Sequence, residues 1–316
     1  GQQTAADWAL RCLARLQRDG GAHEAAVASY QGAIRRDPAD AELWEGLAAS
    51  YQALGRHTAA LKSFNRALEL APGRLFSRMQ AAALHYQLGD MPSALSYYRT
   101  ALAAAPSHPA ALLGCGEVLL AQAALAARAG AAGAAAAELA EATTLAARAT
   151  GQYGNLQAGW KLLGDVRMQH AAVPTLESVV AMTHGSSLGP AAVQSALDAA
   201  RQRVARLRSA RRAYAAALHL DPRVAGLWGD VATSYHLQLE VASQHPELER
   251  EEVAAPTHTA RTRIQKDQDG NQEATVNATT TGIRLRALSF ARGGLRLDPA
   301  SDWLWACAGT IAAAAA

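Results

Sequence analysis

The sequence has little cysteine and little lysine. Three of the 316 residues are cysteine (Cys12, Cys115 and Cys307), no two of them form a C-x-x-C pair, and their spacing fits no zinc module. We therefore expect small buried thiols in a reducing compartment rather than a disulfide framework. Lysine supplies three of the 30 basic residues and arginine the remainder, which we interpret as a compositional bias.

The net charge is also small, and long apolar runs are scarce. A formal charge of +3 over this length does not indicate a nucleic-acid-binding protein. The alanine-rich stretch near 118–137 is the longest apolar run, but it contains Gln122, Arg128 and glycines, so we expect no membrane span. We expect no secretory leader before the first repeated motif. We expect a cytoplasmic protein, with a nuclear pool left open.

Motifs for catalysis or ligand binding are missing as well. The glycine- and serine-containing run at 185–189 lacks the Lys-Ser/Thr of a phosphate-binding loop. Asp267, Asp269 and Gly270 lack the remaining ligands of a calcium loop. The ten histidines form no H-E-x-x-H pattern. The sequence therefore predicts no catalytic residue, no cofactor and no metal: we expect a protein that is not an enzyme.

What the sequence does have is a period of 34 residues. Pro38, Pro72 and Pro106 are each 34 residues apart. The same interval links a glycine set, two alanine sets and an aromatic set: Gly21, Gly55 and Gly89; Ala26, Ala60 and Ala94; Ala33, Ala67 and Ala101; Tyr30, Phe64 and Tyr98. This period with these residue types is the signature of the tetratricopeptide repeat (TPR), a pair of antiparallel helices. Since alanine is also the best helix former, the sequence predicts an all-α TPR α-solenoid, a right-handed superhelix of about six and a half repeats.

The second repeat shows the pattern most clearly. Its first helix has an apolar face at i, i+3 and i+7, a glycine permits the turn, and the second helix places alanines on either side of an aromatic ring. A proline then ends the repeat. The signature residues of this and the other repeats are Trp44, Leu47, Tyr51, Gly55, Ala60, Phe64, Ala67, Pro72, Tyr98, Pro106, Trp160, Gly164, Tyr214, Pro222, Trp228, Pro299 and Trp305.

The interval lapses in the later repeats. The tryptophan expected near 146 lies at Trp160, so fourteen extra residues are expected to lengthen both helices of the fourth repeat, with a turn at 129–133. Trp44, Trp228 and Trp305 each follow a proline by six residues, whereas Arg78 replaces the aromatic residue in the third repeat. We therefore expect one array over residues 1–316. Its repeats lie at about 5–40, 41–74, 75–108, 109–156 (extended), 157–223 (with a loop insertion at 172–190), 224–300 (with a disordered insertion at 244–281) and 301–316 (incomplete, as in a piece of a longer array).

Several of these segments resemble one family, the large TPR scaffold subunit of the superkiller (Ski) complex, a cofactor of the RNA exosome. The similar segments are residues 43–47 and 59–64 of the second repeat, the extended repeat from 109 to 125, and W-K-L-L-G-D at 160–165 followed by a long insertion and residues 214–218. The resemblance covers roughly 40–240, and its specific part is the order of regular, stretched and interrupted repeats. The polar insertion at 244–281 departs from the family.

The resemblance implies a non-catalytic scaffold with protein partners. In that family the scaffold holds a DExH-type RNA helicase and WD40-repeat subunits, and the assembly supports 3′-to-5′ mRNA decay by the cytoplasmic exosome. The alternative is the regulatory or substrate-binding TPR region of a larger enzyme, such as a protein glycosyltransferase. Direct RNA contact is the less favoured expectation.

Two sets of residues are candidates for partner contact. Stacked repeats present a concave face lined by first helices, which here carry Glu42, Glu45, Gln52 and Gln80. The positions that bind an acidic chaperone C-terminus in some TPR proteins are Ala49, Gly46 and Gln80 here, and they supply neither the charge nor the amide. In the fifth repeat, six arginines crowd residues 201–212, and Arg201, Arg208 and Arg212 fall within about 40° of one another on a helix. A solvated face and a contact with an acidic partner or RNA phosphate are both open for these three.

Overall fold

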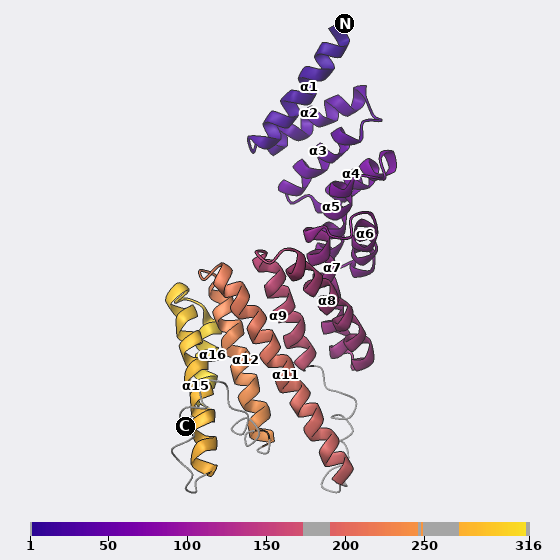
Figure 1. Ribbon diagram of the computed structural model, residues 1–316. Helices are drawn as coiled ribbons and strands as arrows, with labels where there is room; N and C mark the ends of the chain where they lie inside the picture. Colours follow the sequence, from indigo (N-terminus) through magenta and orange to yellow (C-terminus); the bar gives the residue numbers. More distant parts are fainter. Residues whose placement is uncertain (1, 173–189, 246–247, 249–271, 314–316) are drawn as a thin grey trace. The chain divides into compact units, whose positions relative to one another are not determined.

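The computed structural model describes residues 2–172, 190–245, 248 and 272–313, and within these it consists of thirteen α-helices with no strand (Figure 1). The chain divides into two compact units, residues 1–118 and 119–316. The predicted insertion at 172–190 falls almost wholly outside the described residues: helix α9 ends at Ala172 and helix α11 begins at Pro190.

The first unit is a series of antiparallel helix pairs. Its helices are α1 (Gln2–Asp19), α2 (His23–Arg36), α3 (Ala41–Ala53), α4 (His57–Leu70), α5 (Leu75–Gln87), α6 (Met91–Ala104) and the start of α7 (Pro109–Arg128). Helix α1 packs on α2, α3 on α4, and α5 on α6. The periodic glycines Gly21, Gly55 and Gly89 lie in the turns within these pairs, with φ of +79°, +70° and +83°. Only glycine adopts this left-handed conformation without strain, which explains why glycine recurs there.

The offset of six residues between proline and tryptophan corresponds to a hydrogen bond. In four repeats the indole Nε1 of a tryptophan donates to the carbonyl oxygen six residues earlier, at the end of the preceding second helix. Each bond is 2.9 Å long, and the pairs are Trp44 with Pro38, Trp160 with Gly154, Trp228 with Pro222, and Trp305 with Pro299. In the third repeat the guanidinium of Arg78 donates to Pro72 O instead. Arginine therefore replaces the indole as a donor, although it breaks the aromatic pattern.

The core of the first unit combines aromatic rings with alanine. Phe64 is fully buried among Ala48, Ala60 and Ala81, and its ring meets Phe76 edge to face at a centroid distance of 6.3 Å. Alanine has no side chain beyond Cβ, so the helix backbones approach closely and leave one space that the ring fills. This arrangement repeats with Tyr30 in the first pair and Tyr98 in the third.

The second unit contains longer helices. They are α8 (Ala132–Gln152), α9 (Gln157–Ala172), α11 (Pro190–Leu220), α12 (Ala225–Gln244), α15 (Gln272–Leu297) and α16 (Asp302–Ala313). Helix α9 packs on α11 and α8, and α15 packs on α12 and α16. Helices α7 and α8 have 20 and 21 residues, and the turn between them contains Gly130 at φ +78°, within the segment predicted to turn. Here too, aromatic residues such as Tyr214 are buried against small ones.

The polar insertion at 244–281 was predicted to be disordered, and this prediction is wrong for its last ten residues, 272–281. Helix α15 begins at Gln272, so residues 272–281 are helical. Adding residues to an existing helix is easy compared with nucleating one, and threonine and asparagine disfavour helix only weakly. The helix therefore extends into a segment whose composition is polar. Residues 246–247 and 249–271 of this insertion lie outside the described part of the chain.

Helix α7 is the one helix among the described residues that is long and apolar enough to cross a membrane. Its side chains at Leu112, Cys115, Val118 and Leu119 are nearly fully buried in the folded chain. A helix inside a protein core has the same composition, so these properties do not by themselves indicate a membrane span.

Truncating the buried ring of Phe64 should destabilise the first unit. Phe64→Ala leaves a cavity between helices and should lower the free energy of unfolding by about 3–5 kcal/mol, measured by urea denaturation followed by circular dichroism. The control Phe76→Ala removes a ring that is 47% exposed and should cost less than half as much. Equal effects would show that Phe64 is not the enclosed ring.

Removing the indole donor should weaken a repeat boundary. Trp44→Phe keeps an aromatic ring but loses the hydrogen bond to Pro38 O, and should cost about 0.5–1.5 kcal/mol in the same denaturation experiment. Trp8→Phe is the control, because Trp8 is 68% exposed and should tolerate the change within about 0.5 kcal/mol. No difference between the two variants would argue against a stabilising role for this bond.

Candidate functional site

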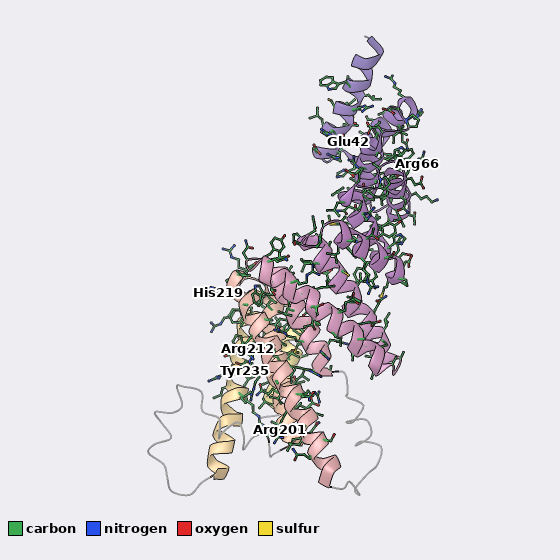
Figure 2. The ribbon with its side chains drawn as sticks, turned by 45° about the vertical axis from the view of Figure 1, so that its right-hand side comes forward. Glu42, Arg66, Arg201, Arg212, His219 and Tyr235 are labelled. Atoms are coloured by element: carbon green, nitrogen blue, oxygen red, sulfur yellow. The ribbon has the colours of Figure 1, made fainter. Side chains whose placement is uncertain are left out.

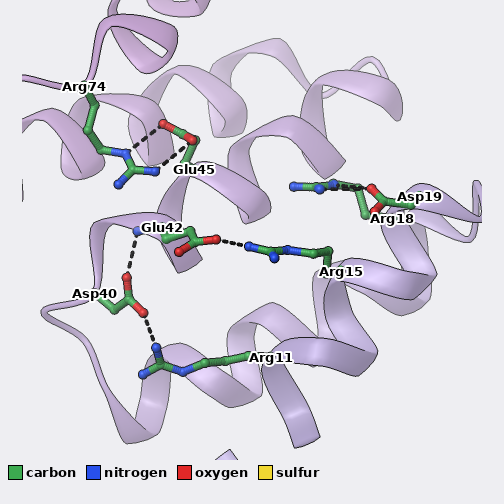
Figure 3. A network of polar contacts seen from close by, with 8 residues as sticks. All are labelled: Arg11, Arg15, Arg18, Asp19, Asp40, Glu42, Glu45 and Arg74. Carbon is green, nitrogen blue, oxygen red and sulfur yellow. Dashed lines mark hydrogen bonds and ion pairs between the residues drawn. The ribbon is translucent and has the colours of Figure 1, made fainter. Parts of the chain in front are cut away.

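A groove lies between the first helices α1 and α3 of the first unit. The groove has a volume of about 540 Å³, and both polar and apolar groups line it. Figure 3 shows how arginines of α1 extend toward acidic residues at the start of α3. The lining residues are Trp8, Arg11, Cys12, Arg15, Arg18, Tyr30, Asp40, Glu42, Leu43, Glu45 and Gly46.

One wall of the groove is formed by three arginines of α1. Arg11, Arg15 and Arg18 stand at i, i+4 and i+7, which places them on one face of the helix. Arg11 is bound by two carboxylates: its Nη2 lies 2.7 Å from Asp37 Oδ2 and its Nη1 lies 2.5 Å from Asp40 Oδ2. Asp40 also accepts a 2.8 Å hydrogen bond from the backbone N–H of Glu42 and thereby caps α3. Arg11 is therefore fixed in place.

The other two arginines are held more loosely. Arg15 pairs with Glu42 alone, and their side chains are 61% and 55% exposed. Arg18 pairs with its sequence neighbour Asp19, whose Oδ1 lies 2.9 Å from Arg18 Nη2. The exposed pair of Arg15 and Glu42 contributes little to stability because water and salt screen it. Arg18 is 31% exposed and also donates from Nε to Asp19 Oδ1 at 3.0 Å. Each of these two arginines has a single carboxylate partner, which a ligand carboxylate can replace.

The opposite wall contains Glu45, which is firmly bound. Its carboxylate accepts two hydrogen bonds of 2.9 Å from Arg74 (Figure 3). It also accepts one of 2.5 Å from the hydroxyl of Ser77. Burial raises the pKa of Glu45, but the hydrogen bonds from Arg74 and Ser77 outweigh it and hold the pKa below its ordinary value. Glu45 therefore stays ionised and neutralised within the chain.

The floor of the groove contains the tyrosine of the first repeat. Tyr30 is 4% exposed, and its ring lies against Gly46 so closely that a methyl group at Gly46 would overlap it. Within the described part of the chain, no hydrogen bond of the Tyr30 hydroxyl is present. Burial raises the pKa of Tyr30; the charges of Arg18 and Arg15 lower it, and those of Asp19 and Glu42 raise it. The hydroxyl thus lies among two guanidinium groups and their two carboxylate partners.

The predicted contact residues of the first unit all lie on α3 and α5. Glu42 and Glu45 line the groove, and Gln52 donates a 3.0 Å hydrogen bond to Gln80 across the two helices. Each of these four side chains has a partner inside the chain. Sequence reasoning missed the three arginines of α1 and the hydroxyl of Tyr30. The spacing of these arginines along α1 could have indicated a shared helix face. Their acidic partners are revealed only by the structure.

The arginine-rich segment of α11 lies in the second unit, and much of it is bound within that unit. Arg206 donates to the backbone oxygen of His170 at 3.2 Å, and Arg201 lies 2.7 Å from Asp198. Arg211 donates to Gln238 at 2.8 Å and stacks 4.0 Å above the centre of the Tyr235 ring.

The two remaining arginines of the predicted set differ from each other. Burial, and then the charge of Arg212, lower the pKa of Arg208, whereas Arg212 is exposed. Figure 2 shows Arg201 and Arg212 at separate points along α11. The predicted trio of Arg201, Arg208 and Arg212 is therefore not a uniformly solvated face.

The W-K-L-L-G-D run builds a polar cluster that the sequence did not predict. Lys161 Nζ lies 2.7 Å from Asp165 Oδ2, and the Tyr214 hydroxyl donates to Asp165 Oδ1 at 2.9 Å. A methyl group at Gly164 would overlap the Tyr214 ring. Asp230 of α12 lies near this cluster. Burial, together with the charge of Asp165, raises its pKa to about 6, although Lys161 opposes the shift.

No metal centre is formed by the residues that the structure describes: no three His, Cys, Asp or Glu side chains among them could hold an ion together. The surface consists of hydrogen-bonding groups, ion pairs and small apolar residues. Such a surface can bind another protein.

Comparison with known proteins agrees with this architecture. Residues 40–107 and, in an overlapping match, residues 79–150 correspond to tetratricopeptide repeats. A TPR protein from Parabacteroides merdae is similar in structure, with 14% identity and a TM-score of 0.55 over 99% of this chain and 100% of that one. A chain of the APC/C hetero-tetramer Cut9–Hcn1 is also similar, with 14% identity and a TM-score of 0.51 over 96% of this chain and 42% of that one. No protein with a curated description matches the sequence.

The predicted fold class is thereby confirmed: the chain is all-α, with the tetratricopeptide repeats and helical arrangement of an α-solenoid. At these low identities the similar structures establish the fold alone. TPR proteins as a class act in protein–protein interaction.

Asp230 should make the stability of the second unit depend on pH. Its pKa rises from an ordinary 3.8 to about 6 in the folded chain, so the folded state binds this proton more tightly than the unfolded state. The stabilisation that the folded state gains from binding this proton is nearly complete below about pH 4 and is lost as the pH rises through about 6. Asp230→Asn stays neutral, and should be more stable than the original protein at pH 7 by about 1–3 kcal/mol.

Urea denaturation at pH 4 and pH 7 tests this expectation. The advantage of Asp230→Asn should fall to about 0.5 kcal/mol at pH 4, because Asp230 is then protonated in the folded state and about half protonated in the unfolded state. Asp198→Asn removes an exposed carboxylate of the same unit and should change stability by less than about 0.5 kcal/mol. An advantage of equal size at both pH values would contradict the assigned protonation.

Proposed function

We propose that this chain is a non-catalytic scaffold that binds protein partners on the first-helix face of its repeats. The observation that supports this most is the groove between α1 and α3, where charged residues, a tyrosine hydroxyl and an exposed tryptophan lie together. The ring of Tyr30 belongs to the core between the helices, whereas the charged groove residues and Trp8 are not part of that core. A mixed polar and aromatic surface of this kind is suited to a protein ligand.

We further infer the partners from the family resemblance. They are a DExH-type RNA helicase and WD40-repeat subunits, in an assembly that supports exosome-dependent mRNA decay in the cytoplasm. The support for this proposal is the order of the repeats: regular repeats, an extended repeat, the W-K-L-L-G-D run, and then an interrupted repeat. Under this proposal the chain positions enzymes but performs no chemistry itself.

Affinity purification of the protein from its native cells, followed by mass spectrometry, tests both levels of the proposal. Recovery of a helicase together with a WD40 protein is the expected result. Recovery of other stable protein partners would retain the scaffold and overturn the assigned partners. Purification of the protein alone, or within a single polypeptide carrying a catalytic domain, would contradict the scaffold function.

A matched pair of charge reversals should locate the binding face. Arg15→Glu with Arg18→Glu alters the groove, whereas Arg66→Glu reverses an exposed charge on the second helix α4 (Figure 2). The groove variant should recover less partner than the Arg66 variant at equal folded content. Equal recovery would place the binding face outside this groove.

A further inference from the structure

We propose that the groove between α1 and α3 binds an acidic side chain of an extended partner peptide through Arg15, Arg18 and the hydroxyl of Tyr30. This inference rests on the proposed function and specifies the chemistry of its ligand. It commits to a glutamate or aspartate within a peptide, next to an apolar residue.

The first argument is the convergence of three donors on one groove. Arg15 and Arg18 both line it; Arg15 reaches Glu42 at the start of α3, and Arg18 pairs with Asp19 at the end of α1 (Figure 3). Both charges act on the Tyr30 hydroxyl from nearby. Two guanidinium groups and a hydroxyl offer a carboxylate several charge-assisted hydrogen bonds, which are stronger than bonds between neutral groups.

The second argument is the unused hydroxyl of Tyr30. The Tyr30 ring is buried and lines the groove, and within the described part of the chain its hydroxyl makes no hydrogen bond to another residue. The hydroxyl oxygen is not one of the fully enclosed polar atoms that lack a partner, so it reaches the open groove. It can therefore donate to a ligand carboxylate in place of water.

The acidic wall of the groove does not prevent this binding. Arg11 neutralises Asp40, and Arg74 with Ser77 neutralises Glu45. Glu42 is different, because it has an exposed pair with Arg15 and no bond from Arg18. Glu42 therefore occupies the place on Arg15 that the ligand takes, and acts as an internal competitor.

Trp8 is the reason to expect an apolar residue in the ligand. This tryptophan lines the same groove and is 68% exposed. An exposed indole provides a large contact area with little loss of conformational entropy. An apolar residue next to the acidic one can pack on it while the carboxylate reaches the arginines.

The third repeat supplies a matched comparison within the same unit. Tyr98 is 7% exposed, and a methyl group at Gly114 would overlap its ring, as at Tyr30 and Gly46. Burial raises the pKa of Tyr98 to about 12, and the carboxylate of Glu117 adds to this shift. At Tyr30, by contrast, Arg18 and Arg15 act beside the carboxylates of Asp19 and Glu42. The packing geometry is therefore shared, and the arginines distinguish the step between α1 and α3.

The test uses the whole 316-residue chain and a random library of short peptides with acetylated N-termini and amidated C-termini. Peptides selected on the protein should be enriched in glutamate or aspartate beside an apolar residue. Their affinities are then measured by fluorescence anisotropy for each variant, with circular dichroism to verify equal helix content.

The variants separate the groups involved. Arg18→Gln and Tyr30→Phe should each weaken binding about tenfold, the usual effect of losing a hydrogen bond to a charged group. Glu42→Gln should strengthen binding about two- to fivefold, because it removes an exposed competing pair. Tyr98→Phe makes the same change in the third repeat and should leave the affinity unchanged.

Each contrary result has a distinct meaning. Selected peptides without acidic enrichment, or with equal affinity for Arg18→Gln, Tyr30→Phe and the original protein, would overturn the inference and leave the scaffold function standing. A peptide that binds only with a free C-terminal carboxylate would also overturn it, since the groove would then recognise a chain end. If the protein recovers partners from cells but selects no peptide from the library, binding of an extended peptide is overturned and the scaffold function stands.

Discussion

The close contact between an aromatic ring on one helix and a residue without a large side chain on the next determines much of this structure. Tyr30, Tyr98 and Tyr214 each lie where a methyl group on the facing glycine would overlap the ring, and Phe64 is enclosed by alanines. These contacts set the separation of the helices, which leaves no space for larger side chains. They also bring the tyrosine hydroxyl to the polar first-helix face, so the same contact that forms the core supplies a functional group to the surface.

The sequence was sufficient to predict the parts of the fold that depend on local residue type. Gly55 must adopt positive φ, Pro72 cannot continue a helix, and alanine must recur where helices meet. It also predicted that Trp44 occupies an equivalent position in its repeat. It could not show why Arg78 is tolerated at the same position, because the shared feature is a hydrogen bond to a carbonyl rather than an aromatic ring.

The charged contacts of the site could not be predicted in this way. The interval of 34 residues indicates which residues share a helix face. It does not indicate which basic and acidic side chains form ion pairs between two helices. Arg11 reaches Asp37 and Asp40, and Arg74 reaches Glu45, over separations that no local rule relates. The crowding of arginine on α11 looked like a surface feature for the same reason. Several of those guanidinium groups are bound by carbonyl, amide and aromatic groups that only the fold brings near.

The difference between fixed and exchangeable charges follows from these partners. Arg11 and Glu45 each have more than one hydrogen-bonded partner, so a ligand would have to replace all of them at once. Arg15 has one exposed partner, which water already screens. In the second unit, by contrast, the Tyr214 hydroxyl is already bound by Asp165, so the equivalent ring presents no free donor. One repeated packing contact therefore produces a closed polar cluster in one place and an open donor in another, and the arginines of α1 give the open donor its preference for a carboxylate.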